Sequence, residues 1–197
     1  NYAPGHDQTA CSGIYCVQFN YFRSDAAGYR FLAQWKQACF KYDKNQPKRF
    51  PGQTCMDTWP TESNAVCVIQ NPSAGVAPWN HALFKFSAVN DVPQIDGKPI
   101  VFFHFHQLSF INDSTFMAAM YPMDSAVLNL IYRPYVARLK ALRSDLQARV
   151  PGFDYCKRFH RPNVGSTLLS FSRANWRELL RYVYGHIRRR ANILRVS

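Results

Sequence analysis

Two contrasting patterns of apolar and polar positions follow one another near the start of the chain. Residues 12–25 alternate between apolar and polar side chains, which predicts a β-strand with one strongly apolar face. Ser24 or Asp25 then offers a helix cap, and the apolar spacing changes to that of a helix over residues 26–42. The helical apolar stripe consists of Phe31, Leu32, Trp35, Ala38 and Cys39.

The middle of the chain consists of short segments separated by turn-forming residues. Residues 43–52 are polar and end in Pro-Gly, so they predict a loop. Residues 53–60 predict a short helix that Pro60 ends, and residues 65–70 predict a short buried strand. A further loop is expected over residues 71–80, which are rich in Gly, Pro, Asn and Ser.

The stretch KPIVFFHFHQLSF, residues 98–110, is the most apolar run of this region and predicts a buried strand. It contains His104 and His106, which lie two residues apart and would share one strand face. Two ionisable imidazoles at the end of an apolar strand suggest a binding site. The alternative is that both rings are hydrogen-bonded parts of the core.

Helical patterns dominate from residue 124. Residues 125–150 carry apolar side chains at helical spacing, and Pro134 should kink or break this helix. A second helix is predicted near the end of the chain, where Asn175 and Glu178 resemble a capping box. Its expected apolar face consists of Trp176, Leu179, Leu180, Val183 and Ile187.

The order of strands and helices predicts an α/β fold with a mixed sheet flanked by helices and a helical basic C-terminal segment. Three predicted strands are few for an independent α/β sheet, because such sheets have about five or six. We therefore expect a partial sheet. The predicted domains are residues 1–155, an α/β domain, and residues 156–197, a basic amphipathic helical extension.

The charge of the chain is strongly positive, with 24 Lys and Arg against 12 Asp and Glu. Ten of the basic residues lie between Lys157 and Arg195, where Glu178 is the single acid. This excess predicts an anionic partner such as phosphate, nucleic acid or a membrane surface. We expect the C-terminal helix to lie on an anionic membrane surface, although its apolar face could instead pack on the domain core.

The six cysteines form no C-x-x-C pair and match no zinc-binding spacing. Cys39, Cys55 and Cys67 lie in apolar contexts, which predicts reduced thiols in the core. The sequence contains no secretory signal and no apolar run of about 20 residues. These features predict a cytoplasmic protein that can lie at the periphery of the inner membrane. The chain begins with Asn1 rather than Met, so we expect it to be a fragment of a longer protein.

Five stretches in chain order resemble one family. They resemble the C-terminal half of bacterial GT-A-type glycosyltransferase-like proteins that build surface polysaccharides, and they cover about residues 10–155. The stretches are SGIYCVQFNYFRSDAAGYRFLAQW, FPGQTCMDTWP, GVAPWN, IVFFHFHQL and IYRPYVARL.

The resemblance implies an α/β fold that binds a nucleotide sugar and transfers the sugar to a glycan or a lipid-linked acceptor. A divalent ion, Mn²⁺ or Mg²⁺, bridges the diphosphate in such proteins. An Asp-x-Asp motif of the N-terminal half and one His of an H-x-x-G stretch commonly hold it. In this sequence the H-x-x-G stretch aligns with His104, and Gln107 takes the Gly position. The resemblance therefore implies that His104 binds the metal. It gives His106 a supporting role at the substrate.

The resemblance also implies residues for the sugar region. Gln53, Trp79 and Asn80 would bind sugars, and Asp57, one helical turn from Gln53, would be the catalytic acid residue of the region. Gly52 takes the place of an Asp of the family. Cys16 and Gln18 likewise replace an Asn and a Gly.

The chain contains no Asp-x-Asp and no Gly-rich phosphate loop. We therefore expect a separate N-terminal half or a catalytic partner chain, and we expect the isolated chain to be inactive. A non-catalytic module that binds glycans or a partner is the first alternative. The second is a basic nucleic-acid-binding protein, which the net charge of +12 suggests although no known nucleic-acid motif is present.

Overall fold

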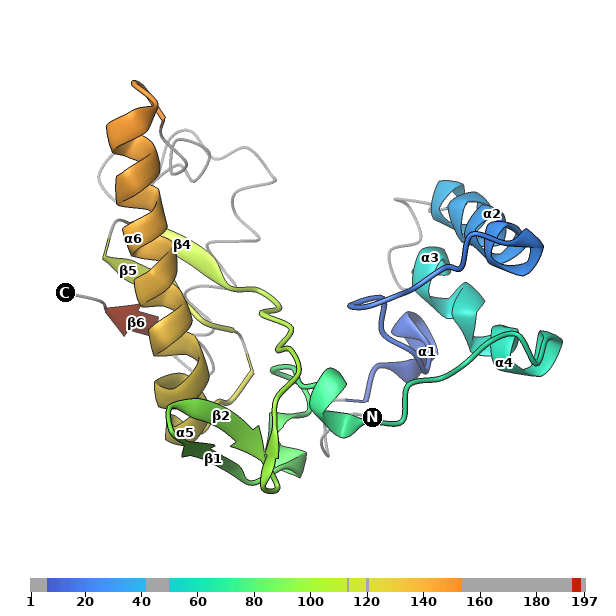
Figure 1. The fold of residues 1–197 in the computed structure, drawn as a ribbon, viewed down its shortest axis with the longest axis horizontal. Coiled ribbons are helices and arrows are strands. Elements are labelled where there is room, and N and C mark those ends of the chain that lie inside the picture. Colours follow the sequence, from blue (N-terminus) through green and yellow to red (C-terminus); the bar gives the residue numbers. More distant parts are fainter. Residues whose placement is uncertain (1–6, 42–49, 113, 120, 154–192, 196–197) are drawn as a thin grey trace, which may run out of the picture. The chain divides into compact units, whose positions relative to one another are not determined.

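The computed structural model describes residues 7–41, 50–112, 114–119, 121–153 and 193–195. The chain divides into two compact units, Asn1–Gly75 (unit 1) and Val76–Ser197 (unit 2). Each unit has its own buried apolar cluster. Figure 1 shows the fold, and the two units are described separately below.

Unit 1 is helical in its described part. Its helices are α1 (Thr9–Ser12), α2 (Ala26–Phe40), α3 (Pro51–Thr54), the 3₁₀ helix η1 (Cys55–Thr58), α4 (Trp59–Glu62) and the 3₁₀ helix η2 (Pro72–Ala74). The Asp25 carboxylate caps α2 by accepting the Gly28 N–H at 2.8 Å. The prediction of a helix from residue 26 is confirmed, as is the short helical region around residues 53–60.

Aromatic rings form the core of unit 1. Phe31 of α2 and Trp59 of α4 are buried, and their ring centroids lie 5.1 Å apart. Phe22 stacks on Trp35 at 5.7 Å and meets the edge of Trp59 at 6.2 Å. The Trp35 indole N–H also donates a hydrogen bond to the Gly52 carbonyl, so α2 is fixed to α3 by a polar contact beside the aromatic packing.

The predicted strand over residues 12–25 is wrong. Residues 13–24 form loops and turns, and the left-handed Gly13 (φ 81°) follows directly on α1. Alternation predicts a strand only where a second strand completes the hydrogen bonds, and the described part of unit 1 contains no strand. Tyr15 and Phe22 still pack against the core, whereas Tyr21 is 77% exposed.

The predicted buried strand over residues 65–70 is also wrong, because these residues are irregular and mostly exposed. The cysteines that we expected in the core are more accessible than predicted. Cys39 and Cys67 are exposed and Cys55 is partly buried. All three are free thiols. An apolar neighbourhood in sequence therefore does not ensure burial: Cys39 is exposed although its sulfur lies beside Gly52 of α3.

Unit 2 contains a three-stranded antiparallel sheet that the hydrophobic pattern did not indicate. Its strands are β1 (Phe86–Val89), β2 (Val92–Ile95) and β3 (Lys98–Pro99). Two-residue turns, Asn90-Asp91 and Asp96-Gly97, join them, and all four residues have φ between 49° and 76°. Such backbone angles match the tight turns that Asn, Asp and Gly favour between twisted strands.

A second antiparallel sheet contains β4 (Ser109–Asn112), β5 (Thr115–Met117) and β6 (Ile193–Arg195), with β5 in the centre. Phe116 of β5 and Leu194 of β6 are paired, and both are buried in one cluster with Val136. In Figure 1, the helix that carries Val136 runs alongside this sheet. The last strand comes from a stretch for which we predicted no strand.

The predicted strand over residues 98–110 is largely wrong. Only its two ends are strands, β3 and the start of β4, and residues 100–108 connect them as an irregular segment. His104 and His106 therefore lie in a connection and not at the tip of a strand. This segment makes a single parallel bridge, between Phe103 and Val76, so it has too few backbone partners to form a strand.

The predicted helix over residues 125–150 is confirmed, but Pro134 does not break it. It comprises α5 (Ser125–Val127), the π-helical segment η4 (Leu128–Tyr132) and α6 (Arg133–Arg149), which follow one another without a break. Proline cannot donate its backbone nitrogen to the carbonyl four residues earlier, and its ring clashes there. The wider π-helical turn just before Pro134 makes room for that ring, so the helix continues.

The α/β composition predicted from the sequence is confirmed at this coarse level: small antiparallel sheets combine with helices. The short 3₁₀ helix η3 (His81–Leu83) completes the described elements. The C-terminal helix expected over residues 172–191 lies outside the described residues, and the predicted domain boundary at residue 155 stays a prediction. No helix in the described part of the chain is both long and apolar enough to cross a membrane.

Replacing Gly28 by Ala should destabilise unit 1. Alanine normally favours a helix over glycine by about 1 kcal/mol, but a Cβ at Gly28 would lie 1.9 Å from the Arg23 carbonyl oxygen. We expect Gly28→Ala to lower the free energy of unfolding by about 1–3 kcal/mol in urea denaturation. Gly75→Ala is the matched control, because a Cβ there meets nothing closer than 3.6 Å. Equal stability of the two variants would contradict this.

Candidate functional site

The segment 100–108 places two of its three phenylalanines, Phe103 and Phe105, against the long helix of unit 2. The Phe103 and Phe105 rings lie 5.0 Å apart and meet the Tyr132 ring edge-on at 5.5 and 5.2 Å. Phe105 also stacks on Tyr135 at 3.9 Å. Tyr132 is fully buried, and burial raises the pKa of its hydroxyl. The phenylalanines thus anchor a segment that has almost no strand hydrogen bonds.

The same segment is joined by backbone contacts to the loop over residues 76–80. The His104 N–H donates to the Val76 carbonyl at 2.9 Å, next to the parallel bridge between Val76 and Phe103. Val76 and Ala77 are fully buried. Two of the stretches that carry the family resemblance, GVAPWN and IVFFHFHQL, therefore lie side by side.

Their side chains form a group of rings that we call the imidazole cluster: Trp79, His104, His106 and Tyr121. The Trp79 ring lies 5.1 Å from His104 and 5.4 Å from His106, in edge-on geometry. The two imidazoles are 5.8 Å apart, and Tyr121 lies 6.2 Å from His106. Three residues that the sequence predicted for the site, Trp79, His104 and His106, are thus brought together.

Both histidines of the cluster are partly buried, and the pKa of each lies below its ordinary value of 6.5. Burial is the main cause for both, and the neighbouring His106 lowers the pKa of His104 further. Both rings are therefore mainly neutral at pH 7. A neutral imidazole carries one donor and one acceptor nitrogen, so each ring can both give and receive a hydrogen bond.

Asn80 and His81 hold the loop that carries Trp79. The Asn80 carboxamide oxygen accepts the Ala77 N–H at 2.8 Å, and Asn80 is buried. His81 is also buried; its Nδ1 lies 2.9 Å from the Pro78 carbonyl, and its Nε2 lies 3.8 Å from the Asp124 carboxylate. Asn80, predicted to contact sugar, thus has a positioning role at Trp79. Sequence reasoning missed His81, although it follows Trp79-Asn80 directly.

Gln107 has φ 66°, in the left-handed region that glycine enters most readily. This is the position at which the resembling family commonly has the Gly of its H-x-x-G stretch. Gln107 therefore has a backbone conformation that is typical of glycine, although its side chain is that of glutamine.

Gln53 and Asp57 belong to unit 1, on α3 and η1, and not to the unit that holds the imidazole cluster. The Asp57 carboxylate accepts the Ile14 N–H at 2.8 Å. A Cβ at Gly13 would lie 2.8 Å from the same carboxylate. Asp57 therefore fixes the turn that follows α1, and its proposed catalytic role stays a prediction.

Gly52 and Gln18, two positions at which unit 1 departs from the family pattern, are closely surrounded by other residues. A Cβ at Gly52 would lie 2.7 Å from the Cys39 sulfur, so an aspartate here would require Cys39 to move. The Gln18 carboxamide nitrogen lies 3.6 Å from the position of a Cβ at Gly75. Gln18 thus lies over the turn that ends unit 1 and occupies space that a glycine would leave open.

The donors that the described residues bring to the imidazole cluster do not complete a site for Mn²⁺ or Mg²⁺. No group of three or more His, Cys, Asp or Glu side chains able to hold a metal occurs among them. Mg²⁺ prefers hard oxygen ligands, and imidazole suits softer metals better. His104 could supply one imidazole ligand, and the described residues gather no set of three ligands around it.

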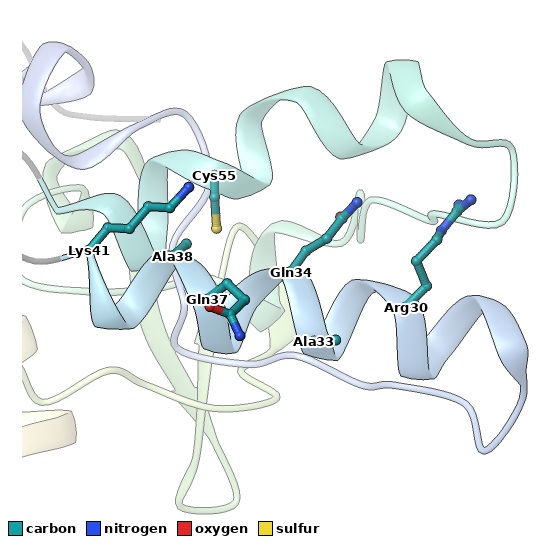
Figure 2. Close-up of a pocket in the computed structure, with 7 residues that line it drawn as sticks. All are labelled: Arg30, Ala33, Gln34, Gln37, Ala38, Lys41 and Cys55. Carbon is teal, nitrogen blue, oxygen red and sulfur yellow. The ribbon is translucent and has the colours of Figure 1, made fainter.

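A shallow depression of about 500 Å³ lies in unit 1, and its lining includes none of the predicted site residues. Arg30, Gln34 and Lys41 extend from one side of α2, and the Cys55 sulfur points toward that helix from η1 (Figure 2). Burial raises the pKa of the Cys55 thiol, so this thiol is poorly reactive. The depression is wide open to solvent, and it offers no enclosed site for a small molecule.

The chain is similar to two uncharacterized proteins of Bacillus subtilis (strain 168). It is 27% identical to YfnD over 131 residues, which cover 64% of this chain and 42% of YfnD. It is 26% identical to YfnF over 147 residues, which cover 72% of this chain and 48% of YfnF. The chain therefore spans less than half the length of these relatives. No protein-family model and no solved structure matches it.

The lowered pKa values predict how the stability of unit 2 depends on pH. Below pH 6.5, His104 and His106 bind protons more readily in the unfolded chain than in the folded imidazole cluster. The contribution of these two rings to stability is therefore complete above pH 6.5. It falls as the pH drops from 6.5 through the lower folded pKa values. We expect His104→Gln/His106→Gln to flatten this fall in urea denaturation between pH 7.5 and 5. Parallel curves for the two proteins would contradict the predicted titration.

Proposed function

We propose that the chain is part of a glycosyltransferase-like protein and that the imidazole cluster contacts a nucleotide-sugar donor. The observation that carries the proposal is the convergence of Trp79, His104 and His106 from two separate stretches of the sequence. Those stretches are two of the five that resemble the family. The relation of this α/β arrangement to the GT-A fold, and the transfer of sugar to a glycan or lipid-linked acceptor, are part of the proposal.

The chemistry of the cluster suits a nucleotide sugar. The Trp79 ring is an apolar surface that can pack on a sugar ring or a nucleobase. His104 and His106 can donate hydrogen bonds to diphosphate oxygens, and a neighbouring dianion would favour their protonated forms. Tyr121 adds a hydroxyl at the edge of the same group.

A metal ion would reach this cluster only with ligands from elsewhere. The chain spans less than half of YfnD and YfnF, so a longer protein or a partner chain could supply carboxylates. Within our proposal, His104 provides one imidazole ligand when such carboxylates are present. A cytoplasmic location, close to the membrane that carries lipid-linked acceptors, is the setting that this reaction would require.

Binding of a nucleoside diphosphate should reveal the role of the cluster. We expect uridine diphosphate without metal to bind weakly in calorimetry and to bind more tightly at pH 6 than at pH 8. Tighter binding at low pH follows because a bound anion raises the imidazole pKa values, so protons and ligand bind together. His104→Ala and His106→Ala should each weaken binding roughly tenfold or more, as expected for one charge-assisted hydrogen bond. Ser87→Ala in β1 is the control.

The same titration with Mn²⁺ separates two roles of His104. Metal ligation requires a neutral imidazole, so a Mn²⁺-dependent gain in affinity should disappear as the pH falls. A direct contact with the diphosphate predicts the opposite trend. Equal heats for the wild type, His104→Ala and His106→Ala at both pH values would contradict the proposed site.

The isolated chain should not transfer sugar. The Asp-x-Asp that usually holds the metal is missing from all 197 residues, and Gly52 replaces a further expected aspartate. Losing such preorganised groups costs about two orders of magnitude in rate each. We expect no release of nucleotide from a panel of nucleotide sugars with Mn²⁺ or Mg²⁺. Metal-dependent turnover that disappears in His104→Ala would overturn this expectation and show that another acid completes the site.

A binding module without catalysis is the second candidate. It is favoured by the described residues themselves, which bring two imidazoles and two aromatic rings together but gather no metal-binding group of three. Glycan binding without nucleotide binding would distinguish it. Nucleic-acid binding, suggested by the charge of +12, remains a third proposal that a salt-dependent filter assay would test.

A further inference from the structure

The buried His81 ring lies between two oxygen atoms of other residues. Its Nδ1 is 2.9 Å from the Pro78 carbonyl oxygen, and its Nε2 is 3.8 Å from the Asp124 carboxylate. A carbonyl oxygen can only accept a hydrogen bond, so Nδ1 carries a proton and donates to it. The carbonyl thereby fixes the orientation of the ring, and Nε2 is the atom that faces Asp124.

Asp124 occupies the position of a helix cap but does not act as one. It precedes α5 with the extended backbone that is usual at an N-cap (φ −72°, ψ 147°), yet its side chain accepts no capping hydrogen bond. The Asp25 carboxylate, by contrast, caps α2. The distance from the Asp124 carboxylate to Nε2 of His81 exceeds that of a direct hydrogen bond and lies within that of an ion pair. The needs of α5 therefore do not explain where this carboxylate lies.

The contact between His81 and Asp124 joins the two segments that carry the aromatic rings of the imidazole cluster. His81 follows Trp79 by two residues, and Asp124 follows Tyr121 by three. The Trp79 and Tyr121 ring centroids lie 6.4 Å apart in edge-on geometry. Because only a few residues separate each ring from the contact, a shift of one segment against the other would rearrange the two rings.

The two partners of the contact differ in their surroundings. The His81 side chain is 6% exposed, whereas the Asp124 side chain is 71% exposed. Water screens the carboxylate, so the contact adds little to the stability of the whole unit. Leaving a buried ring nitrogen without its partner is nevertheless unfavourable, which keeps the two segments together. The contact therefore determines a position more than it contributes stability.

We propose that His81 and Asp124 are positioning residues of the imidazole cluster. Their contact holds the Trp79 loop against the segment of Tyr121, and so fixes the arrangement of rings against which a sugar or a nucleobase packs. Without it, the binding-competent arrangement is populated for a smaller fraction of the time, and the affinity falls by that fraction. The effect on a ligand rests on the proposed function, whereas the effect on Trp79 does not.

Fluorine NMR of the full chain labelled with 5-fluorotryptophan tests the contact. The Trp79 resonance is assigned by its loss in Trp79→Phe. Asp124→Ser supplies a good helix cap, but its hydroxyl is one bond too short to reach His81. Asp124→Asn supplies a cap and also an amide that can donate to Nε2. We expect Asp124→Ser to shift or broaden the Trp79 resonance, and Asp124→Asn to leave it close to that of the wild type.

A change at His81 completes the test. His81→Asn keeps an N–H near the place of Nδ1 for the Pro78 carbonyl but has no atom in place of Nε2. It should alter the Trp79 resonance, and His81→Asn/Asp124→Ser should alter it no further, because the contact is already lost. Asp145→Ala removes an exposed carboxylate from α6 and is the control. An unchanged resonance in Asp124→Ser, equal shifts in Asp124→Ser and Asp124→Asn, or additive single changes would overturn the proposal.

Calorimetry with uridine diphosphate tests the consequence for a ligand. Asp124→Ser should weaken binding about fivefold, whereas Asp124→Asn should bind at least as tightly as the wild type. Both changes remove the same negative charge, which by itself favours an anionic ligand, so a loss in Asp124→Ser reports position and not charge. Absence of binding to the wild type would contradict the proposed function, and the Trp79 resonance would then decide the positioning role. Wild-type binding that Asp124→Ser leaves unchanged would overturn the positioning role alone.

Discussion

The packing of Phe103 and Phe105 against the long helix is the contact on which unit 2 depends. The segment 100–108 has few backbone hydrogen bonds, so side-chain burial has to hold it. Tyr132 receives both phenylalanine rings and is itself fully buried. Because successive side chains of an extended segment point to opposite sides, the residues between and after the phenylalanines are His104 and His106. Apolar packing on one side therefore determines where the imidazoles lie on the other.

The helix that receives these rings is itself adapted to its sequence. Pro134 lies two residues after the end of the π-helical segment η4. A regular helix would break there, and Tyr132 and Tyr135 would then no longer belong to one continuous helix. The π-helical turn keeps both tyrosines on the same element, so Phe103 and Phe105 find a single surface to pack on. Local helix geometry thus supports a distant loop.

The helices could be predicted well from the sequence because their signals are local. Asp25 caps α2, and apolar residues at helical spacing mark both α2 and α6. The strands were predicted poorly. The alternation of apolar and polar residues over residues 12–25 predicts a strand, but the described part of unit 1 contains no strand with which it could pair. The residue pairs Asn90-Asp91 and Asp96-Gly97 are of the kind that favours hairpin turns, and they indicate a hairpin that the spacing of apolar residues does not show.

The candidate site was predicted in part. Trp79, His104 and His106 come together as the resemblance suggested, but nothing in their spacing along the chain required it. The resemblance implies substrate binding for Asn80 and a catalytic role for Asp57. Each side chain accepts a hydrogen bond from a nearby backbone N–H, which fixes the surrounding loop. Polar residues beside a loop serve either purpose, and a single sequence cannot separate a positioning role from a contact with substrate. His81 was missed for the same reason.

The pairing of β6 with β5 affects the order in which the chain can fold during its synthesis. Unit 1 uses contacts within residues 1–75, whereas the buried cluster of unit 2 includes Leu194. Ribosomes add about 5–20 residues per second, so the 120 residues from Gly75 to Arg195 take roughly 6–24 s. From the addition of Phe116 to that of Arg195, 79 residues later, about 4–16 s pass in which Phe116 lacks the β6 strand and stays accessible to chaperones or to other nascent chains. A nascent chain of this protein therefore passes through a stage in which one unit is complete and the other still exposes its core.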